Sequence, residues 1–408
     1  SLFGLVPLLC MEKIGTECGM KKVWMWYYGV FVLWNALTTF WVCNATIGGG
    51  IFAILANAFQ MSLVFGAFRL SRKVFKGVLP YIFLAAAWIA WERYYLTVAQ
   101  ISWPWLVLGN AFARPTRLVP WSEVTGTLGG SLWIWAVNCG LFGIVNSIAE
   151  GSWRGRPAKA RTAAVAALAA LVLGPVAASL IRYSTYDQDS SEGTLKAVVI
   201  QPNYDPWVRA NVLPQRVQTE KAVSMLENTV GRSDSSLVLY AFPETFITDI
   251  WLNDPEASTS WRRMEQFLKD RPNANAVFGA VTREYFFRAS PPSANARRYG
   301  PDAWYEAHNS AFVLDRTGRY DKYHKSKLVV GTESLPYPKL LGGINRALGD
   351  VAGHYVTQSK RTPLSVCEYE GDSLVRSIPV GVGICYESVY GEHMVRARRS
   401  PSHSHHHQ

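Results

Sequence analysis

Residues 23–43 read VWMWYYGVFVLWNALTTFWVC and contain no charged side chain. A helix needs about 20 apolar residues to cross about 30 Å of hydrocarbon, and these 21 residues meet that requirement. Buried helices of a soluble protein would account poorly for the repetition of such runs along the chain. The other candidate spans are residues 47–68, 78–98, 124–149 and 162–181. We therefore predict a polytopic α-helical membrane domain over residues 1–182.

Two features of this half concern polar and aromatic residues. Glu92 and Arg93 interrupt the third span, and because ionisable groups in lipid are costly, we expect them at the interface or facing the bundle interior. The loop of roughly 99–123 contains Trp103, Trp105 and Trp121, which are typical of a headgroup boundary. A packed aromatic plug without a ligand remains an alternative for this loop.

The net charge of +11 is distributed unevenly. Residues 1–182 carry +10 and the remainder of the chain carries +1. The basic residues of the first half lie mainly in three segments between predicted spans, at 11–22, 69–77 and 150–161. Because Lys and Arg are retained on the cytoplasmic side, we predict these segments in the cytoplasm and everything after residue 181 outside it. The charge thus indicates topology and gives no reason to expect a nucleic-acid partner.

From about residue 194 the pattern changes to short apolar runs separated by polar stretches. Alternating strands and helices predict an α/β domain with helices on the faces of a sheet. The predicted strands are 195–201, 237–242, 276–282, 309–314 and 378–385, and the predicted helices are 217–230 and 258–271. The sequence has no glycine-rich phosphate loop and no zinc-ligand spacing, so we expect no cofactor and no metal.

Three residues in this half suggest catalysis. Glu244 follows a predicted strand, Lys325 lies in a polar segment, and Cys385 directly follows an apolar run that we predict as a strand. Taken singly, each has a structural explanation: a helix cap, a solvated charge and a small buried hydrophobic residue. Their order and flanking residues carry more information than any one of them.

In the order Glu, Lys, Cys, these residues resemble the catalytic triad of the nitrilase, or carbon-nitrogen hydrolase, superfamily. With the membrane half included, residues 1–394 resemble the apolipoprotein N-acyltransferase family. The resemblance implies an αββα sandwich for the second domain. The matching segments are Pro243-Glu244-Thr245, Tyr323-His324-Lys325 with Leu328-Val329 and Glu333, Ile384-Cys385-Tyr386-Glu387 with Gly391-Glu392, and Trp103-Pro104-Trp105-Leu106.

The chemistry of the family suits the three residue types. A thiol near its free pKa is mostly protonated at neutral pH, so Cys385 needs a base, and Glu244 is the candidate. The Lys325 ammonium can stabilise the oxyanion formed on an ester carbonyl, together with a backbone N–H after Cys385. The resemblance further implies that Glu333 supports the triad, and that Tyr386 and Glu387 support the nucleophile.

The implied reaction transfers an acyl chain from a phospholipid to Cys385 as a thioester, and then to the α-amino group of a diacylglyceryl-cysteine apolipoprotein. The implied location is the bacterial inner (cytoplasmic) membrane, with the catalytic domain on the periplasmic side. Two other interpretations remain open. The chain could be a membrane-tethered amidase that hydrolyses a small amide, or an inactive truncated fragment.

The apolar, Pro- and Gly-containing segment 334–348 lies between Glu333 and the last predicted strand. We predict that it forms a lid that gates lipid entry, and an ordinary packed loop is the alternative. The side chains expected to face the acyl chain are Leu335, Tyr337, Leu340 and Leu341.

The two ends depart from the family pattern. The sequence begins at Ser1 within an apolar segment, so we expect at least one earlier helix to be missing. We expect the catalytic domain, residues 183–394, to be incomplete after Glu392. Residues 395–408 form a basic, Ser- and His-rich tail that we expect to be foreign to the family and neither strand nor helix. Of the cysteines in this half, we expect Cys367 to be a free thiol, because pairing with Cys385 would block the nucleophile.

Overall fold

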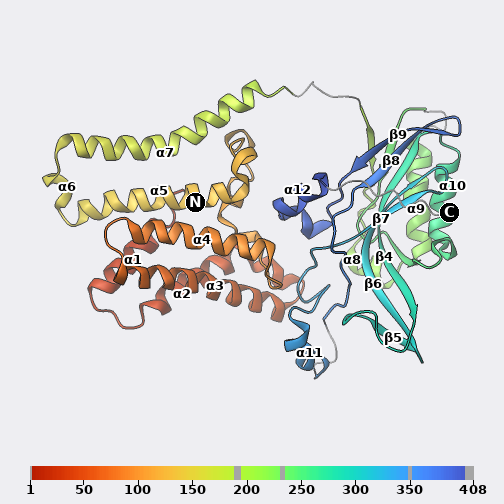
Figure 1. Ribbon diagram of the computed structural model, residues 1–408, viewed down its shortest axis with the longest axis horizontal. Helices are drawn as coiled ribbons and strands as arrows, with labels where there is room; N and C mark the ends of the chain where they lie inside the picture. Colours follow the sequence, from red (N-terminus) through yellow and green to blue (C-terminus); the bar gives the residue numbers. More distant parts are fainter. Residues whose placement is uncertain (1, 188–193, 230–234, 348–351, 400–408) are drawn as a thin grey trace. The chain divides into compact units, whose positions relative to one another are not determined.

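The computed structural model describes residues 2–187, 194–229, 235–347 and 352–399. The chain divides into two compact units, Ser1–Ser190 and Ser191–Gln408. The first unit is α-helical and the second contains the β-sheets (Figure 1). The predicted fold class is therefore confirmed, because a helical region with candidate spans precedes an α/β domain.

All five predicted spans form helices. The helices of the first unit are α1 (Val6–Glu17), α2 (Val23–Thr39), α3 (Ile47–Val74), α4 (Leu79–Thr97), α5 (Ser122–Ala149), α6 (Ser152–Gly155) and α7 (Ala158–Thr185). Short 3-10 turns lie at η1 (Phe40–Asn44), η2 (Pro104–Leu106), η3 (Leu108–Phe112) and η4 (Thr116–Leu118). Among the described residues, α3, α5 and α7 are each long and apolar enough to cross a membrane. For α2, with 17 residues, and for α4, which contains Glu92 and Arg93, spanning stays a prediction.

An aromatic core holds the helical unit together. Phe31 of α2 packs on Phe65 of α3 and on Trp88 of α4, with ring centroids 5.9 Å apart in both pairs. Trp88 in turn meets Trp135 of α5 at 5.1 Å, and all four side chains are buried. Large apolar side chains such as Leu70 remain exposed on the outside, as expected for a surface that faces lipid rather than water.

The charged pair of α4 is divided between inside and outside. Glu92 is buried, and its carboxylate accepts hydrogen bonds from Trp88 Nε1 at 3.1 Å and from the backbone N–H of Leu108 at 2.9 Å. Arg93 is exposed. Glu92 therefore faces the bundle interior, one of the two placements predicted, and it anchors the Trp-rich loop to α4.

The Trp-rich loop contains both packed and accessible rings. Trp121 forms an edge-to-face cluster with Phe112 and Trp133, at 5.8 and 5.9 Å. Trp105 meets Trp41 at 5.7 Å but is 37% exposed. Packing thus explains part of this loop, while Trp105 remains available at its surface.

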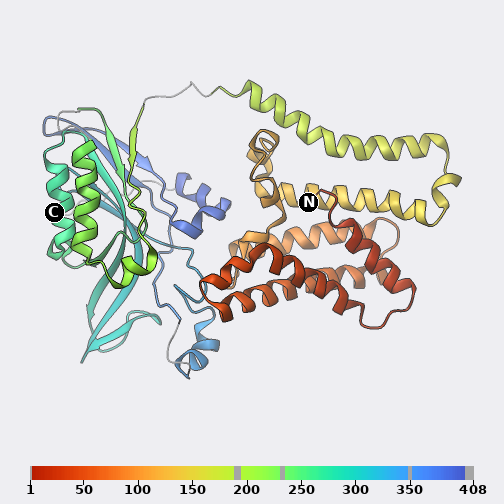
Figure 2. The ribbon, with the colours of Figure 1, turned by 180° about the vertical axis from the view of Figure 1, so that it is seen from behind.

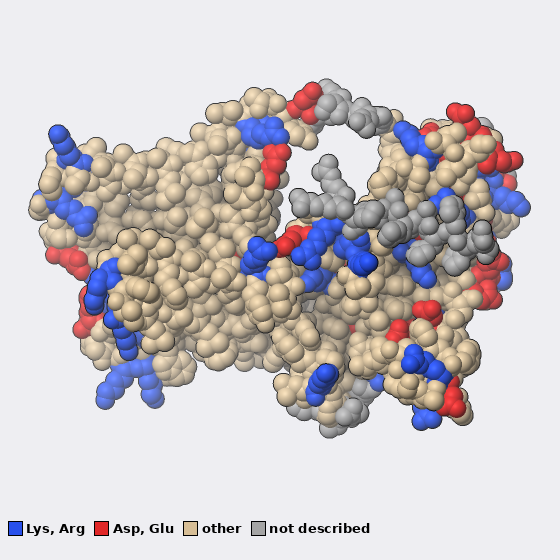
Figure 3. Space-filling view, viewed as in Figure 1, with Lys and Arg blue, Asp and Glu red and all other residues tan. Residues whose placement is uncertain are grey.

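Two sets of ion pairs bring the predicted cytoplasmic segments together. Lys13 of α1 binds Glu150 at the C-terminal end of α5, and Glu12 of α1 binds Arg69 and Arg72 near the end of α3. On the face shown in Figure 3, Lys and Arg gather at the end of the helical unit that carries α6, whereas its sides are mostly uncharged. The three basic segments therefore lie at one end of the unit. Which side of the membrane this end faces stays a prediction.

The second unit is built on a seven-stranded mixed sheet in the order β1-β2-β4-β6-β5, with β3 paired to β4 and β7 to β6. Strands β1, β2, β3 and β4 pair in parallel, and the contacts of β6 are antiparallel. The strands are β1 (Lys196–Val199), β2 (Val238–Ala241), β3 (Ile247–Trp251), β4 (Ala274–Phe287), β5 (Arg297–Gly300), β6 (Ala303–Asp315) and β7 (Tyr320–His324). A second sheet pairs β8 (Leu364–Glu370) with β9 (Ser373–Val380).

Helices and strands form layers on the two faces of the large sheet (Figures 1 and 2). On one face, α10 (Thr259–Lys269) buries Trp261 against Phe278 and Phe312 of the sheet. On the other face, Val313 belongs to a core shared with Val366 of β8. The remaining helices of this unit are α8 (Pro206–Asn211), α9 (Gln215–Thr229), α11 (Pro338–Ala347), α12 (Gly391–Arg399), η5 (Pro255–Ala257) and η6 (Cys385–Val389).

Two expectations about local structure were wrong. The strand predicted for 378–385 ends at Val380, and the apolar residues that follow are irregular because the Val382 carbonyl accepts a hydrogen bond from the Arg361 guanidinium at 2.6 Å. Residues 395–408 were expected to be neither strand nor helix, yet residues 395–399 belong to α12 (Gly391–Arg399), which has Glu392 in its first turn, where a negative charge stabilises a helix. The rest of the predicted tail, 400–408, lies outside the described residues.

Candidate active site

Glu244 lies in the turn that follows β2, and strand β4 holds the backbone of this turn. Phe242 N–H donates to the Val277 carbonyl at 2.8 Å, and Gly279 N–H donates to the Pro243 carbonyl at 3.1 Å. The approach at Gly279 is so close that a Cβ there would lie 2.6 Å from the Glu244 Cα. Only glycine fits this position without moving the turn, so Gly279 helps to define where Glu244 stands.

Lys325 directly follows β7 and is almost completely buried, with its side chain 1% exposed. Its backbone N–H donates to the Asn309 carbonyl at 2.8 Å, which continues the pairing of β7 with β6. Its Nζ lies 3.3 Å from Glu244 Oε1 and 3.0 Å from Glu333 Oε1. A buried ammonium is tolerable only with such partners, and two carboxylates here bind one cation.

Asn309 joins the same two carboxylates from β6. Its Nδ2 donates to Glu244 Oε1 at 2.8 Å and to Glu333 Oε1 at 2.9 Å. An ionised carboxylate accepts hydrogen bonds and cannot donate them, so a single amide group bridges the two carboxylates. Sequence analysis placed Asn309 at the start of a strand and gave it no role. A buried Asn at the polar end of an apolar strand was the available signal.

Glu333 is fixed by its own turn. Its Oε2 accepts from the Val329 backbone N–H at 2.8 Å, and its backbone N–H donates to the Val329 carbonyl at 3.0 Å. Gly353 packs against this turn, and a Cβ there would lie 2.6 Å from the Glu333 Cα. Each of the two acidic residues therefore stands in a turn that a glycine approaches closely.

Cys385 is exposed and begins η6 with a backbone φ of +48°. This left-handed conformation is uncommon for a residue with a Cβ, and such strain clusters at functional sites. The Glu244 and Lys325 side chains lie close enough to the Cys385 thiol for their charges to act on it, and the Tyr386 backbone N–H faces it as well. The structure thus brings together the three residues that the sequence singled out.

The environment sets the protonation of the thiol and the amine. Burial, and next to it the negative charge of Glu244, raises the pKa of the Cys385 thiol, while Lys325 acts in the opposite direction. Burial alone would lower the pKa of Lys325, but the charges of Glu333 and Glu244 outweigh it, and the pKa is raised. At neutral pH the site therefore holds a neutral thiol beside a permanently charged ammonium.

Glu387 is the centre of a buried network behind Cys385. One carboxylate oxygen accepts from Tyr323 OH at 2.6 Å and from the Ser326 N–H at 2.8 Å, and the other accepts from the Ile384 N–H at 2.9 Å. Burial alone would raise the pKa of Glu387, but its hydrogen bonds, the largest from His393, lower it to about 2. The network ties the residue before Cys385 to the segment that carries Lys325.

Arg361 completes this network and was missed by sequence analysis. Its Nη1 donates to Tyr323 OH at 2.7 Å and lies 3.3 Å from Glu387 Oε2, while its Nη2 binds the Val382 carbonyl. Arg361 is therefore a cationic partner of the buried Glu387 carboxylate. Tyr386 is also buried and packs edge-to-face on Tyr390 at 5.2 Å.

Comparison with known proteins connects this site to a family. Residues 1–140 match the family model described as apolipoprotein N-acyltransferase N-terminal domain, and residues 198–400 match the carbon-nitrogen hydrolase model. An apolipoprotein N-acyltransferase of Chlorobaculum tepidum is 25% identical over 396 residues, which are 95% of this chain and 69% of that protein. The chain belongs to the apolipoprotein N-acyltransferase family. It is also a member of the carbon-nitrogen hydrolase superfamily. The helical domain precedes the hydrolase-type domain, which is the order expected.

The residues predicted for the lid of this N-acyltransferase family member do not belong to the ion-pair cluster around Lys325. Leu335 and Leu341 are half-buried, Leu340 is 76% exposed, and Tyr337 is exposed with a φ of +46°. Helix α11 forms most of the predicted lid, 334–348, and residue 348 lies outside the described residues. Cys367 is a buried free thiol, as expected. Within the described part of the chain, no group of three His, Cys, Asp or Glu residues could hold a metal ion.

Proposed function

We propose that the protein transfers an acyl chain from a membrane phospholipid to the α-amino group of a diacylglyceryl-cysteine apolipoprotein. The observation that carries this proposal is the buried Lys325 ammonium, held between Glu244 and Glu333 beside the exposed Cys385. This arrangement provides a nucleophile, a base and an electrophilic group within one site. Membership of the apolipoprotein N-acyltransferase family, together with three helices apolar enough to span a membrane, favours lipid substrates over soluble ones.

In the first half-reaction, Glu244 accepts the proton of Cys385 as the sulfur attacks the ester carbonyl of the phospholipid. The C–S bond forms and the carbonyl oxygen becomes an oxyanion, which Lys325 and the Tyr386 backbone N–H stabilise. The tetrahedral intermediate collapses with cleavage of the C–O bond. The lysophospholipid leaves with the proton returned by Glu244, and the acyl chain remains on Cys385 as a thioester.

In the second half-reaction, the uncharged α-amino group of the apolipoprotein attacks the thioester. Glu244 takes a proton from the attacking nitrogen and passes it to the departing sulfur, so an amide forms and the thiol is restored. Glu333 holds Lys325 in position throughout. Glu387 and Tyr386 position the segment that carries Cys385, one through its hydrogen-bond network and the other through its packed ring.

The same proposal includes topology and domain roles. Residues 1–182 form the multi-pass membrane domain, residues 183–394 form the catalytic domain, and residues 395–408 form an atypical tail. The protein lies in the bacterial inner membrane. The basic end of its helical unit faces the cytoplasm, and the catalytic domain faces the periplasm. The segment 334–348 acts as a lid, in which α11 presents the exposed Leu340 to the acyl chain.

Labelled phosphatidylethanolamine tests this function directly. After incubation with the purified chain, mass spectrometry of the peptide that contains Cys385 should reveal a thioester, and a diacylglyceryl peptide should then remove it as an N-acyl product. Cys385→Ala is the matched control. Turnover of small amides without label on Cys385 would instead indicate a membrane-tethered amidase. Neither label nor amide turnover would indicate an inactive fragment.

A further inference from the structure

A large apolar groove lies within the helical unit. It has a volume of about 980 Å³ and is lined by α4, α5 and α7. Apolar side chains form most of its wall, among them Tyr81, Ile82, Trp135, Phe142, Leu168 and Leu171. The polar residues Arg156 and Asn146 lie on its wall as well. Asn146 accepts a hydrogen bond from Lys13, which places this part of the groove at the basic end of the unit.

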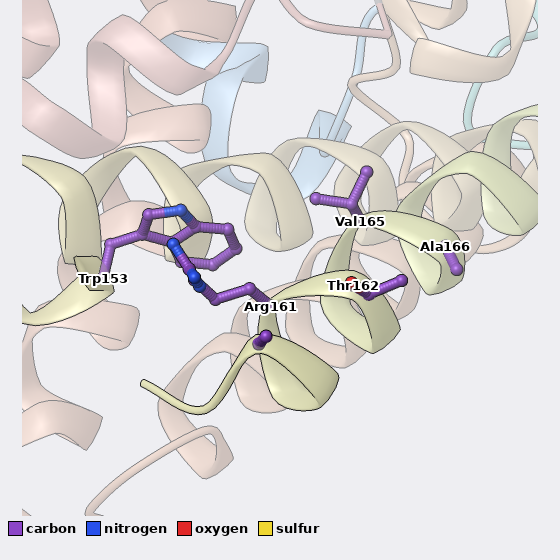
Figure 4. Close-up of a pocket in the computed structure, with 6 residues that line it drawn as sticks. Trp153, Arg161, Thr162, Val165 and Ala166 are labelled. Atoms are coloured by element: carbon purple, nitrogen blue, oxygen red, sulfur yellow. The ribbon is translucent and has the colours of Figure 1, made fainter. Parts of the chain in front are cut away.

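A second, smaller pocket of about 420 Å³ adjoins the turn between α6 and α7. Figure 4 shows Trp153, Arg161 and Thr162 on its wall, followed by Val165 and Ala166 of α7. The Arg156 guanidinium lies 6.0 Å from the centre of the Trp153 ring, and Arg161 lines the same pocket as that ring. Both arginines, Arg156 just before α7 and Arg161 in its first turns, therefore lie near the Trp153 ring.

The cations of this turn differ from those beside it. Lys13, Arg69 and Arg72 are bound by carboxylates. For Arg154, Arg156, Lys159 and Arg161, no carboxylate partner exists among the residues that the structure describes, and Arg161 Nε is buried without an acceptor there. Four adjacent cations without a counter-charge attract an anion, and the Trp153 ring beside them is of the kind found at a headgroup boundary.

We infer that an anionic phospholipid binds here, with its phosphate at Arg156 and Arg161 and an acyl chain in the groove between α4, α5 and α7. A neutral lipid would fill the groove but leave the cations unmatched. A soluble anion would match the cations but leave the apolar wall exposed. A lipid with a net negative headgroup satisfies both surfaces.

Native mass spectrometry of the full chain tests this inference. After purification from membranes that contain equal amounts of phosphatidylglycerol and phosphatidylcholine, the chain should retain phosphatidylglycerol preferentially. The double variant Arg156→Gln/Arg161→Gln should retain it about tenfold less. The matched control, Lys21→Gln/Lys22→Gln, removes the same charge from the exposed turn before α2 and should retain it as the unchanged chain does.

A second pair of variants tests the groove without changing charge. Ala167→Phe fills the groove and should lower phosphatidylglycerol retention, whereas Ala163→Phe, on an exposed part of α7 outside it, should not. Gel filtration and thermal unfolding identify any variant that has lost its fold. Equal retention of both lipids, equal loss in the two charge variants, or full displacement by inorganic phosphate would each overturn the inference.

Discussion

Gly279 lies against the backbone of Glu244, and a Cβ at position 279 would come within 2.6 Å of the Glu244 Cα. Gly279→Ala should therefore displace the Glu244 turn and slow thioester formation on Cys385 by at least about tenfold, because small misplacements of catalytic groups cost that much or more. Gly300→Ala is the control, since a Cβ there would meet only the Ala303 Cβ, at 3.8 Å. Equal acylation rates in the two variants would contradict the positional role of Gly279.

Asn309 donates to both carboxylates that bind Lys325. Hydrogen bonds to charged groups contribute roughly 1.5–3 kcal/mol, so Asn309→Leu should slow acylation roughly ten- to hundredfold. Asn275→Leu removes another buried amide, one that bonds the backbone of Cys367. If this control slowed acylation equally, Asn309 would have only a structural role.

The pKa of Cys385 is raised by burial and then by the charge of Glu244. Alkylation of Cys385 by iodoacetamide should therefore increase with pH up to values above those typical of a free thiol, since the thiolate is the reactive form. Glu244→Gln removes the negative charge and should move the midpoint of alkylation to lower pH. Mass spectrometry can follow Cys385 and the exposed Cys18 in the same sample. A midpoint that rises in Glu244→Gln would refute this electrostatic account.

Glu387 contributes a pH-dependent term to stability. Its pKa is lowered to about 2 in the folded protein, so the carboxylate stabilises the fold fully above about pH 4.5, and this contribution is lost as the pH falls toward 2. The shift corresponds to about 3 kcal/mol at neutral pH. Glu387→Gln should lower the thermal unfolding temperature most at pH 7, and the difference should shrink with acidification.

Glu392 provides the comparison for this prediction. It forms an exposed pair with Arg396, and exposed pairs contribute little to stability. Glu392→Gln should change the unfolding temperature only slightly at any pH. A difference between wild type and Glu387→Gln that stayed constant from pH 7 to pH 3 would argue against the lowered pKa.

The lid is tested by Leu340 and Leu341. Replacing both by Ser should slow acyl-enzyme formation from phospholipid, because the exposed apolar face of α11 would lose its affinity for the acyl chain. Cleavage of a short-chain water-soluble ester should change little. Lys339→Ser, on the same helix, controls for altered helix stability. Unchanged acylation from phospholipid in the double variant would exclude gating.

The sequence predicted the parts of this molecule that depend on local pattern. Long uncharged runs became helices, and short apolar runs marked β1, β2, β4 and β6. Strand β7, YDKYH, escaped prediction because it is polar and only Tyr323 of its five residues is buried. The apolar run before Cys385 caused the opposite error, because a strand was predicted where none forms beyond Val380. It is apolar enough for a strand, but a side chain, Arg361, takes the place of a neighbouring strand as partner of Val382.

The residues of the candidate site also divide into those that the local sequence predicts and those that it does not. Glu244, Lys325 and Cys385 could be found because they stand in recognisable short segments. Asn309 and Arg361 could not, since their importance comes from partners that the fold brings together over long separations, such as the 65 residues between Asn309 and Glu244. The roles of Gly279 and Gly353 could not be predicted either, because the sequence of neither segment alone shows that two backbones approach closely.

Accessibility increases stepwise across the site. The exposed fraction of the side chain is 1% for Lys325, 14% for Glu333 and 34% for Glu244, and Cys385 is exposed. Cys385 is thus the most accessible of these groups, and in the proposed reaction the acyl donor and the amine acceptor meet the same sulfur in turn. Between the departure of the lysolipid and the arrival of the amine, water competes for the thioester. The ratio of aminolysis to hydrolysis therefore measures how well the protein protects the thioester from water.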